Sequence, residues 1–268
     1  MKNTDTQPTL QDRAVDSANL QVRASGNKQF GDADFNGWVS GTIDDLQYSS
    51  VLDICCGTGN QLVLYAARPG TERMVGVDLS TESLSVTGER IRDAAPSLDV
   101  ALIEAGMDDA FDNPVMSDRK FDLVSCFYGL YYALDVAGVL SNIVASLADE
   151  GTVLIVGPYG ENNASLFGIL NNHFELPQLV TRSATTFMEA EVLPVLSAAL
   201  AVESRTFVNR VSYPNPTAVM NYWKASTFYN EAAEAGVAGD IDRHFRDNGK
   251  FVVEKHVMAI LGRKAESP

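Results

Sequence analysis

A short apolar strand that breaks into a glycine turn and then a helix constrains this chain most. Residues 50–55 are mainly apolar, and the turn glycines Gly57 and Gly59 follow them. A second strand is predicted over residues 74–78, and it ends in an acid, Asp78. Ligands of open α/β sheets bind beyond the carboxyl ends of the strands. The two strand ends therefore predict a ligand pocket.

The residue types at these strand ends narrow the ligand. Glycine lets the backbone approach a ligand where a Cβ would collide, and Asp78 can accept two hydrogen bonds from the vicinal hydroxyls of a ribose. A dinucleotide fingerprint needs a third glycine, but Leu62 stands there. Asp53, inside the first strand, suits a cationic ligand or a tie to the glycine loop better than a pyrophosphate. The pattern predicts a nucleoside pocket.

Residues 53–59 resemble the E/D-x-G-x-G-x-G signature of class I, Rossmann-like S-adenosylmethionine-dependent methyltransferases of the small-molecule type. Asp53 is the acid, and Cys55 replaces the first glycine, which slightly narrows the loop. The resemblance is clear over about residues 35–157 and weaker over the closing strands. It implies an α/β fold with a seven-stranded, mostly parallel, doubly wound sheet. It also implies an antiparallel last strand and a helical lid insertion between strands five and six.

The hydrophobic periodicity along the chain agrees with alternating strands and helices, which imply right-handed crossovers and a parallel sheet. Strands are predicted over residues 50–55, 74–78, 99–104, 121–127, 152–156, 202–213 and 251–261. Helices are predicted over residues 34–46, 60–67 and 136–147, between Ser80 and Pro96, and after the Pro-Asn-Pro turn at 214–216.

The same patterns suggest how the chain is organised. Residues 1–34 are expected to form an N-terminal segment, partly flexible or part of a lid, since the first 20 or so are polar. Residues 35–268 are expected to form the methyltransferase domain, with residues 158–200 and 214–248 as helical insertions that cover the substrate.

Composition restricts the class of partner. A formal charge of -15 argues against a nucleic-acid substrate, whose phosphates would be repelled. An Asn/Asp-Pro-Pro-Tyr/Phe motif is also missing after the fourth strand. No apolar run approaches the roughly 20 residues that span a bilayer. Three cysteines without paired spacing indicate neither a disulfide framework nor a metal site, which favours a cytoplasmic protein. A small-molecule acceptor is expected, and a homodimer is compatible with these features.

The resemblance implies S-adenosyl-L-methionine as cofactor and S-adenosyl-L-homocysteine as product. The residues it implies for cofactor binding are Asp53, Cys55, Gly57, Gly59, Asp78, Leu79, Met107, Asp108, Cys126 and Phe127. Asp78 would bind the ribose and Leu79 the adenine ring, although Asp78 could instead stabilise a helix N-terminus. Met107 and Asp108 would contact adenine, but Gly106 stands where many relatives have the acid. A solvated acidic loop is the alternative.

Catalytic candidates follow from the chemistry of methyl transfer. Holding the nucleophile in line supplies much of the barrier reduction, and an oxygen nucleophile usually also needs a base. His173, in the expected lid, and Tyr128 are the candidates for that base. Tyr128, Tyr131 and Tyr132 could instead surround a sulfonium, or pack in the core.

The sequence therefore predicts methyl transfer from S-adenosylmethionine to a small polar acceptor. Oxygen is favoured over nitrogen as the acceptor atom. Asn162 and Asn163 suggest a sugar or another secondary metabolite, although surface turns use asparagine just as often. Two alternatives stay open. One is a catalytically silent cofactor-binding partner subunit, and the other is an NAD-dependent Rossmann enzyme, against which Leu62 and Asp53 count.

Overall fold

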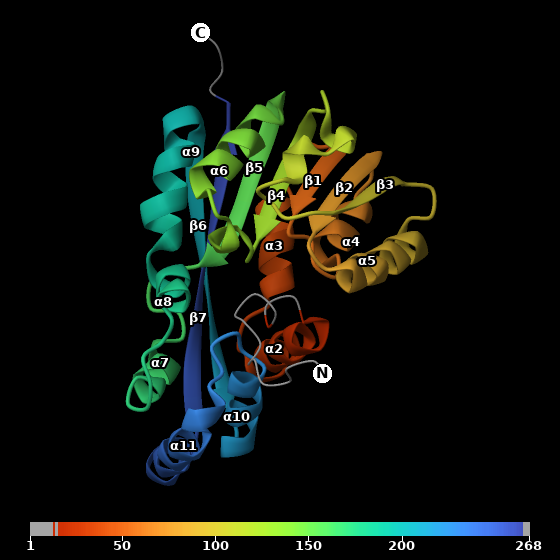
Figure 1. Ribbon diagram of the computed structural model, residues 1–268. Coiled ribbons are helices and arrows are strands. Elements are labelled where there is room, and N and C mark those ends of the chain that lie inside the picture. Colours follow the sequence, from red (N-terminus) through yellow and green to blue (C-terminus); the bar gives the residue numbers. More distant parts are fainter. Residues whose placement is uncertain (1–12, 14–15, 265–268) are drawn as a thin grey trace, which may run out of the picture. The chain divides into compact units, whose positions relative to one another are not determined.

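The computed structural model describes Arg13 and residues 16–264, which fall into two compact units (Figure 1). The larger, here called the sheet unit, comprises residues 35–160, 182–207 and the described residues from 256. The smaller, here called the helical unit, comprises the described residues up to 34, residues 161–181 and residues 208–255.

A seven-stranded sheet organises the fold. Its strands are β1 (Ser50–Ile54), β2 (Arg73–Asp78), β3 (Asp99–Glu104), β4 (Phe121–Phe127), β5 (Leu147–Pro158), β6 (Ala201–Tyr213) and β7 (Phe251–Arg263). They lie in the order β3-β2-β1-β4-β5-β7-β6. Strands β1 to β5 pair in parallel, and β7 pairs antiparallel with β5. The predicted mostly parallel sheet with an antiparallel last strand is confirmed.

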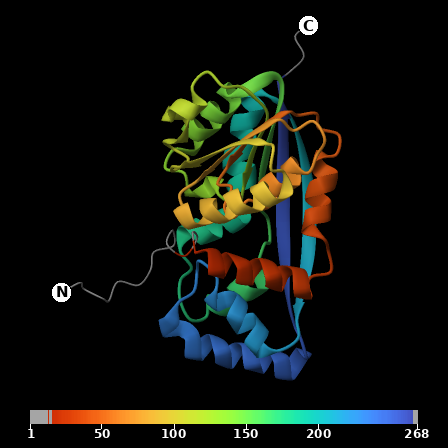
Figure 2. The same cartoon turned by 90° about the vertical axis from the view of Figure 1, so that its right-hand side faces the viewer.

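Helices cover both faces of the sheet in the sheet unit (Figure 2). One face packs against α3 (Phe35–Ile43), α4 (Asn60–Ala66) and α5 (Thr81–Ala94), and the other packs against α6 (Val136–Ala145) and α9 (Leu193–Ala199). Successive residues of a strand point to opposite faces. Accordingly, Val51 packs in the apolar cluster on the face covered by α3, α4 and α5, and Leu52 packs in the cluster on the face covered by α6 and α9. Both faces are buried, as expected for parallel strands with near-continuous apolar runs.

Strand β5 begins five residues earlier than predicted, at Leu147, because α6 ends at Ala145. Leu147 pairs with Phe121, and the register then shifts before the pairing of β4 and β5 resumes. Gly151 allows this irregularity, since a Cβ there would lie 2.7 Å from the carbonyl oxygen of Phe121. A local pattern that reads as the end of a helix therefore becomes strand through pairing with β4.

The predicted helical insertion between the fifth and sixth strands is confirmed. It contains α7 (Ala164–Leu170), α8 (Gln178–Thr185), a π-helical turn (Met188–Val192) and α9. The sequence treats residues 158–200 as one insertion, whereas the chain from residue 182 groups with the sheet unit. Its role as a substrate lid stays a prediction.

The helical unit contains α7, α10 (Pro216–Lys224), α11 (Glu234–Asn248) and α2 (Ser17–Phe30). Helix α2 is not among the predicted elements. Its N-cap, Asp16, accepts a hydrogen bond from the backbone N–H of Asn19 at 2.9 Å. The expectation of a frayed polar start falls largely on residues 1–12 and 14–15, which lie outside the described residues. None of the described helices is both long and apolar enough to cross a bilayer.

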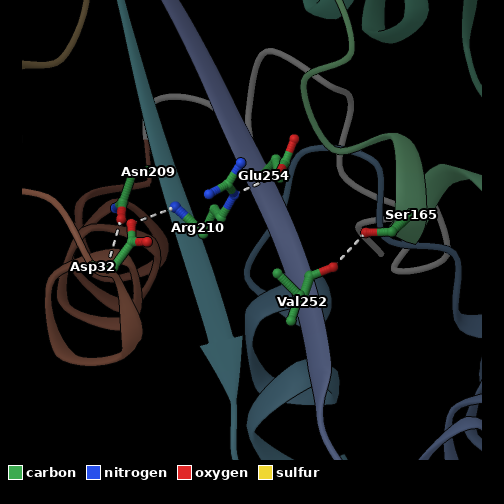
Figure 3. A network of polar contacts seen from close by, with 6 residues as sticks. All are labelled: Asp32, Ser165, Asn209, Arg210, Val252 and Glu254. Atoms are coloured by element: carbon green, nitrogen blue, oxygen red, sulfur yellow. Dashed lines mark hydrogen bonds and ion pairs between the residues drawn. The ribbon is translucent and has the colours of Figure 1, made fainter. Parts of the chain in front are cut away.

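Polar contacts join the elements of the helical unit (Figure 3). Asp32, just after α2, accepts a hydrogen bond from the backbone N–H of Arg210 at 2.9 Å. The Arg210 side chain bonds Glu254 of β7 at 2.7 Å, and Ser165 of α7 donates to the carbonyl of Val252 at 2.7 Å. These contacts fasten α2, β6, β7 and α7 to one another within the unit.

A buried lysine lies at the centre of the helical unit. The Nζ of Lys255 bonds the hydroxyl of Tyr222 at 2.5 Å, and it also bonds Oδ1 of Asn163. Burial, assisted by the positive charge of Arg23, lowers the pKa of Lys255 well below its ordinary value. The side chain of Asn163 is therefore a structural partner within the unit.

Candidate functional site

The glycine turn after β1 has a left-handed backbone at both of its glycines. Gly57 and Gly59 have φ angles of 53° and 77°, and Gly59 is the N-cap of α4. Thr87 of α5 donates a hydrogen bond to the carbonyl of Gly57 at 2.8 Å. A Cβ at Gly59 would lie 2.8 Å from Cγ2 of Thr87, so this position requires glycine on steric as well as conformational grounds. Helix α5 thereby holds the turn in place.

Leu62, where a dinucleotide fingerprint has its third glycine, is fully buried in α4. The close packing that such a glycine would allow is provided instead by Gly76 of β2. A Cβ at Gly76 would lie 2.8 Å from Cδ1 of Leu62. The larger helix residue is thus matched by a glycine on the neighbouring strand, and the sequence pattern gave no sign of this pairing.

Cys55 is a second residue whose side chain is accommodated by a glycine on another segment. It has a φ angle of 61°, in the left-handed region that favours glycine, although it carries a side chain. The thiol occupies space next to Gly129, where a Cβ would lie 2.5 Å from Sγ of Cys55. Gly129 follows β4, so the room for Cys55 comes from a distant segment. The narrowing of the glycine loop expected from Cys55 is therefore offset by the missing side chain at Gly129.

Asp78 ties the end of β2 to the glycine turn. Its Oδ2 accepts a hydrogen bond from the backbone N–H of Gly57 at 2.8 Å, and its Oδ1 accepts one from Ser80 at 2.9 Å. Ser80 is the N-cap of α5, so the acid also lies at a helix start. Each carboxylate oxygen keeps a further lone pair. Both roles considered for Asp78, hydroxyl recognition and stabilisation of the helix, are therefore compatible with this geometry.

Asp53 is a buried acid beneath the glycine turn, with only 1% of its surface exposed. Its Oδ1 accepts a hydrogen bond from the hydroxyl of Ser125 at 2.6 Å, whereas Oδ2 is buried without a hydrogen-bonding partner among the described residues. The pKa of Asp53 is raised to about 7, mainly by burial; the hydrogen bond from Ser125 opposes the shift and the negative charge of Asp78 adds to it. A buried oxygen of this kind fits a cationic ligand group, because a positive charge would satisfy it.

The loop after β3 is anchored by the acid predicted to contact adenine. Asp108 accepts hydrogen bonds from the backbone N–H groups of Leu134 and Asp135, each at 3.0 Å. Met107, its predicted neighbour in adenine binding, is largely buried in the apolar cluster on the α6 side of the sheet. The structure thus gives Asp108 a part in joining two loops, and contact of either residue with adenine stays a prediction.

Three apolar side chains are exposed in the segments that follow β2 and β4. Leu79 follows β2 and is 48% exposed, while Tyr128 and Leu134 follow β4 and are 39% and 94% exposed. Cys126 and Phe127, in contrast, are buried within β4, and their predicted role in cofactor binding is not tested by this burial. The carboxyl edge of the sheet therefore combines a buried acid, Asp53, and a partly exposed one, Asp78, with exposed apolar groups.

Aromatic rings that the sequence did not assign to the site lie next to Tyr128. The ring of Phe35, from the first turn of α3, is 6.1 Å from that of Tyr128 and 5.8 Å from that of Trp38. Phe207 of β6 contacts both Phe35 and Trp38. The helical periodicity of residues 34–46 indicated a core face, but only the fold shows that this face reaches Tyr128.

His173, the first candidate for a base, belongs to the helical unit. Its Nε2 lies 2.9 Å from Oδ2 of Asp240 in α11, and their side chains are 22% and 18% exposed. Arg243 bonds the other oxygen of Asp240 at 2.7 Å. The hydrogen bond from His173 lowers the pKa of Asp240, with Arg243 contributing to the shift. A carboxylate can orient an imidazole for proton transfer, or the two can form a structural ion pair. The catalytic role of His173 stays a prediction.

A hollow of about 590 Å³ opens at the opposite edge of the sheet, where the strands begin. Asp122 lines it and accepts hydrogen bonds from the hydroxyls and backbone N–H groups of Ser49 and Ser50. One oxygen of this carboxylate, Oδ2, accepts all four hydrogen bonds, so Asp122 fastens the start of β1 to the start of β4. No group of three or more potential metal ligands occurs among the described residues.

The sheet unit matches known proteins over the region that carries these acids. Residues 51–151 match the methyltransferase domain family. The chain is 37% identical over 94 residues to a 2-phytyl-1,4-naphtoquinone methyltransferase from Synechococcus elongatus, which covers 35% of this chain and 39% of that protein. It is 29% identical to a demethylmenaquinone methyltransferase from Lactobacillus johnsonii, covering 45% and 50%. The matches thus span half or less of these relatives.

Solved structures share the fold at low sequence identity. The YcgJ protein from Bacillus subtilis superimposes with a TM-score of 0.60 at 17% identity, covering 86% of this chain and 98% of that one. The plantazolicin methyltransferase BpumL, solved in complex with SAH, gives a TM-score of 0.52 at 14% identity, covering 95% and 91%. At these identities the comparison establishes the fold alone.

Proposed function

We propose that this protein transfers a methyl group from S-adenosylmethionine to a small-molecule acceptor, in keeping with the match of residues 51–151 to the methyltransferase domain family. The observation that carries the proposal is the pair of acids at adjacent strand ends. Asp78 holds the glycine turn and can accept ribose hydroxyls, and Asp53 keeps one buried oxygen for a cation. These two carboxylates fit a nucleoside that carries positive charge. When bound, the cofactor supplies an electrophilic methyl group on a sulfonium.

The remaining residues of the proposed cofactor site shape it. Gly57 and Gly59 let the backbone approach the ligand, and Leu79 offers an exposed apolar surface for the adenine ring. The negative charge of Asp53 and Asp78 favours a cationic ligand at this edge. The chain's contribution to the reaction is then mainly to hold the two reactants in line and exclude water.

We propose that the acceptor has an apolar, planar face and an oxygen nucleophile, as in a phenolic or hydroquinone metabolite. The exposed side chains of Tyr128 and Leu134 support the apolar face, and the two curated relatives are named for quinone substrates. An oxygen nucleophile usually needs a base, and His173 with its partner Asp240 stays the proposed one. A sugar is the weaker alternative, because Asn163 is engaged by Lys255 and Tyr222.

Methyl-labelled S-adenosylmethionine and a panel of acceptors would test the proposal. The panel should include a naphthohydroquinone, simple phenols, glycosides and primary amines. We expect label on an aromatic hydroxyl compound and stoichiometric S-adenosylhomocysteine. Label only on a glycoside or an amine would contradict the proposed acceptor. Tight S-adenosylhomocysteine binding without transfer to any acceptor would indicate a silent binding subunit, and binding of NAD instead would contradict the cofactor.

The raised pKa of Asp53 predicts that cofactor binding depends on pH. A cationic ligand group pairs with the ionised acid, so S-adenosylhomocysteine affinity should fall about tenfold from pH 8 to pH 6 as Asp53 takes up a proton. Calorimetry in buffers of different ionisation enthalpy should show release of about half a proton at pH 7. The stability of the unliganded protein should depend on pH in the opposite direction to the affinity. A raised acid pKa contributes stability at low pH that is lost as pH rises through about 7.

Two variants serve as controls for this dependence. Asp53→Asn retains the shape of the side chain but cannot ionise, so its affinity should be low and flat across this pH range. Ser125→Ala removes the hydrogen bond that opposes the pKa shift, so the midpoint should move to higher pH. An unchanged pH profile in Asp53→Asn would assign the titration to another group.

A further inference from the structure

Two of the three cysteines lie side by side at the base of the glycine turn. Cys55 follows β1, and Cys126 lies in β4, the adjacent parallel strand, where it pairs with Ile54. The site that a Cβ would take at Gly129 lies 2.5 Å from Sγ of Cys55 and 3.7 Å from Sγ of Cys126. Both sulfurs therefore border the same small space.

Strand geometry brings these cysteines within reach of a covalent bond. Cys55 stands one residue beyond Ile54, the register partner of Cys126. A strand spacing of about 4.8 Å and a rise of about 3.3 Å per residue place the two Cα atoms roughly 6 Å apart, within the roughly 4.4–6.8 Å that a disulfide spans. The left-handed backbone at Cys55 and the absence of a side chain at Gly129 direct the thiol into this space. Cys56, the next residue, belongs instead to the apolar cluster on the other face of the sheet. Cys56 can therefore serve as an internal control for reactions of Cys55 and Cys126.

We propose that Cys55 and Cys126 form a redox-sensitive pair, and that their oxidation to a disulfide by a hydroperoxide lowers cofactor affinity. Cys55 is partly exposed, whereas Cys126 is fully buried, so Cys55 is the one proposed to meet the oxidant first. The effect on the cofactor rests on the proposed function; formation of the disulfide does not.

The reaction balances with a hydroperoxide as oxidant. The sulfur of Cys55 attacks the peroxide, the O–O bond breaks, and a sulfenic acid and water form. The sulfur of Cys126 then displaces water from the sulfenic acid, so two thiols and hydrogen peroxide become a disulfide and two waters. The neighbouring Cys126 thiol and burial raise the pKa of the Cys55 thiol. Because the thiolate is the reactive form, oxidation should be faster at pH 9 than at pH 7.

Closure of the bond would displace the glycine turn. A disulfide holds its sulfurs about 2.05 Å apart, closer than any non-bonded thiol contact. Cys55 must then move toward β4 and pull on the segment that carries Gly57, which Asp78 holds at 2.8 Å. Since the turn is the surface proposed to bind the cofactor, this displacement should weaken binding.

Oxidation of the full chain with hydrogen peroxide, followed by intact-mass measurement and mapping of a non-reducing digest, tests the proposal. We expect a loss of about 2 Da and a peptide pair that joins Cys55 to Cys126. S-adenosylhomocysteine affinity should be at least about tenfold lower and recover with dithiothreitol. Cys56→Ser should behave like the unaltered protein, and Cys55→Ser should lose both effects.

Several results would overturn the proposal. They are three free thiols after oxidation, sulfinic or sulfonic acid at Cys55 alone, a bond between Cys55 and Cys56, or a mapped Cys55–Cys126 bond that leaves affinity unchanged. The digest of the unaltered chain decides on the disulfide even where a variant does not fold. Failure of the reduced protein to bind S-adenosylhomocysteine would count against the proposed function, while the mapping would still decide on the bond.

Discussion

Replacing Asp78 by Ala is expected to weaken S-adenosylhomocysteine binding by about 1.5–3 kcal/mol, or roughly 10- to 150-fold. The variant loses the carboxylate proposed to bind the ribose hydroxyls, and it also releases the backbone N–H of Gly57 from its 2.8 Å hydrogen bond. Both changes act on the same ligand, so the loss should lie toward the upper end of this range. Isothermal titration calorimetry at pH 8 would measure it, away from the titration of Asp53.

Two comparisons separate these contributions. Asp93→Ala removes an exposed acid of α5 and should leave affinity unchanged, which controls for net charge. Asp78→Asn can still accept a hydrogen bond from Gly57, so it should lose less than Asp78→Ala. If a folded Asp78→Ala variant binds with unaltered affinity, Asp78 is not part of the cofactor site.

Replacing His173 by Ala is expected to lower turnover about 100-fold or more while leaving S-adenosylhomocysteine affinity unchanged. Asp240 would orient the imidazole of His173 through its 2.9 Å contact with Nε2. The other ring nitrogen, Nδ1, would then be the one that accepts the proton. Nδ1 faces Gly236, where a Cβ would lie 2.5 Å away. Gly236→Ala should therefore displace the ring and lower turnover as well, without removing any polar group.

The matched control for His173 is His244→Ala, which removes a histidine from α11 and should leave turnover unchanged. A pH–rate profile adds a second measurement, since loss of a base should also remove a limb of the profile. Unaltered turnover in both His173→Ala and Gly236→Ala would assign this pair to structure alone. Tyr128 would then be the remaining candidate for the base.

Local patterns were sufficient for much of the sheet. The strands over residues 99–104 and 121–127 were predicted with the bounds that the structure shows, and most others agree within two residues. Their apolar runs and flanking turns are properties of short segments, so pairing with other strands did not alter them. Strand β5 departs from its prediction because its first five residues depend on pairing with β4.

The division of the chain into two units could not be predicted from such patterns. Helix α2 has few apolar residues to signal an amphipathic face, and its contacts come from β6 and from the segment after α10. Residues 182–200 are predicted as part of the insertion over residues 158–200, yet their packing places them in the sheet unit. Both outcomes depend on contacts between segments that are far apart in the sequence.

By itself, the sequence determined the strand–turn–helix unit, the glycines at 57 and 59, and the acids Asp53 and Asp78, because each follows from residue types at fixed local spacing. Only the tertiary structure decided how their neighbours complete the site. Gly76 makes room for Leu62, and Gly129 makes room for Cys55. These pairs join residues that meet only when the strands pack, so their physical cause, the steric fit between distant segments, leaves no local pattern.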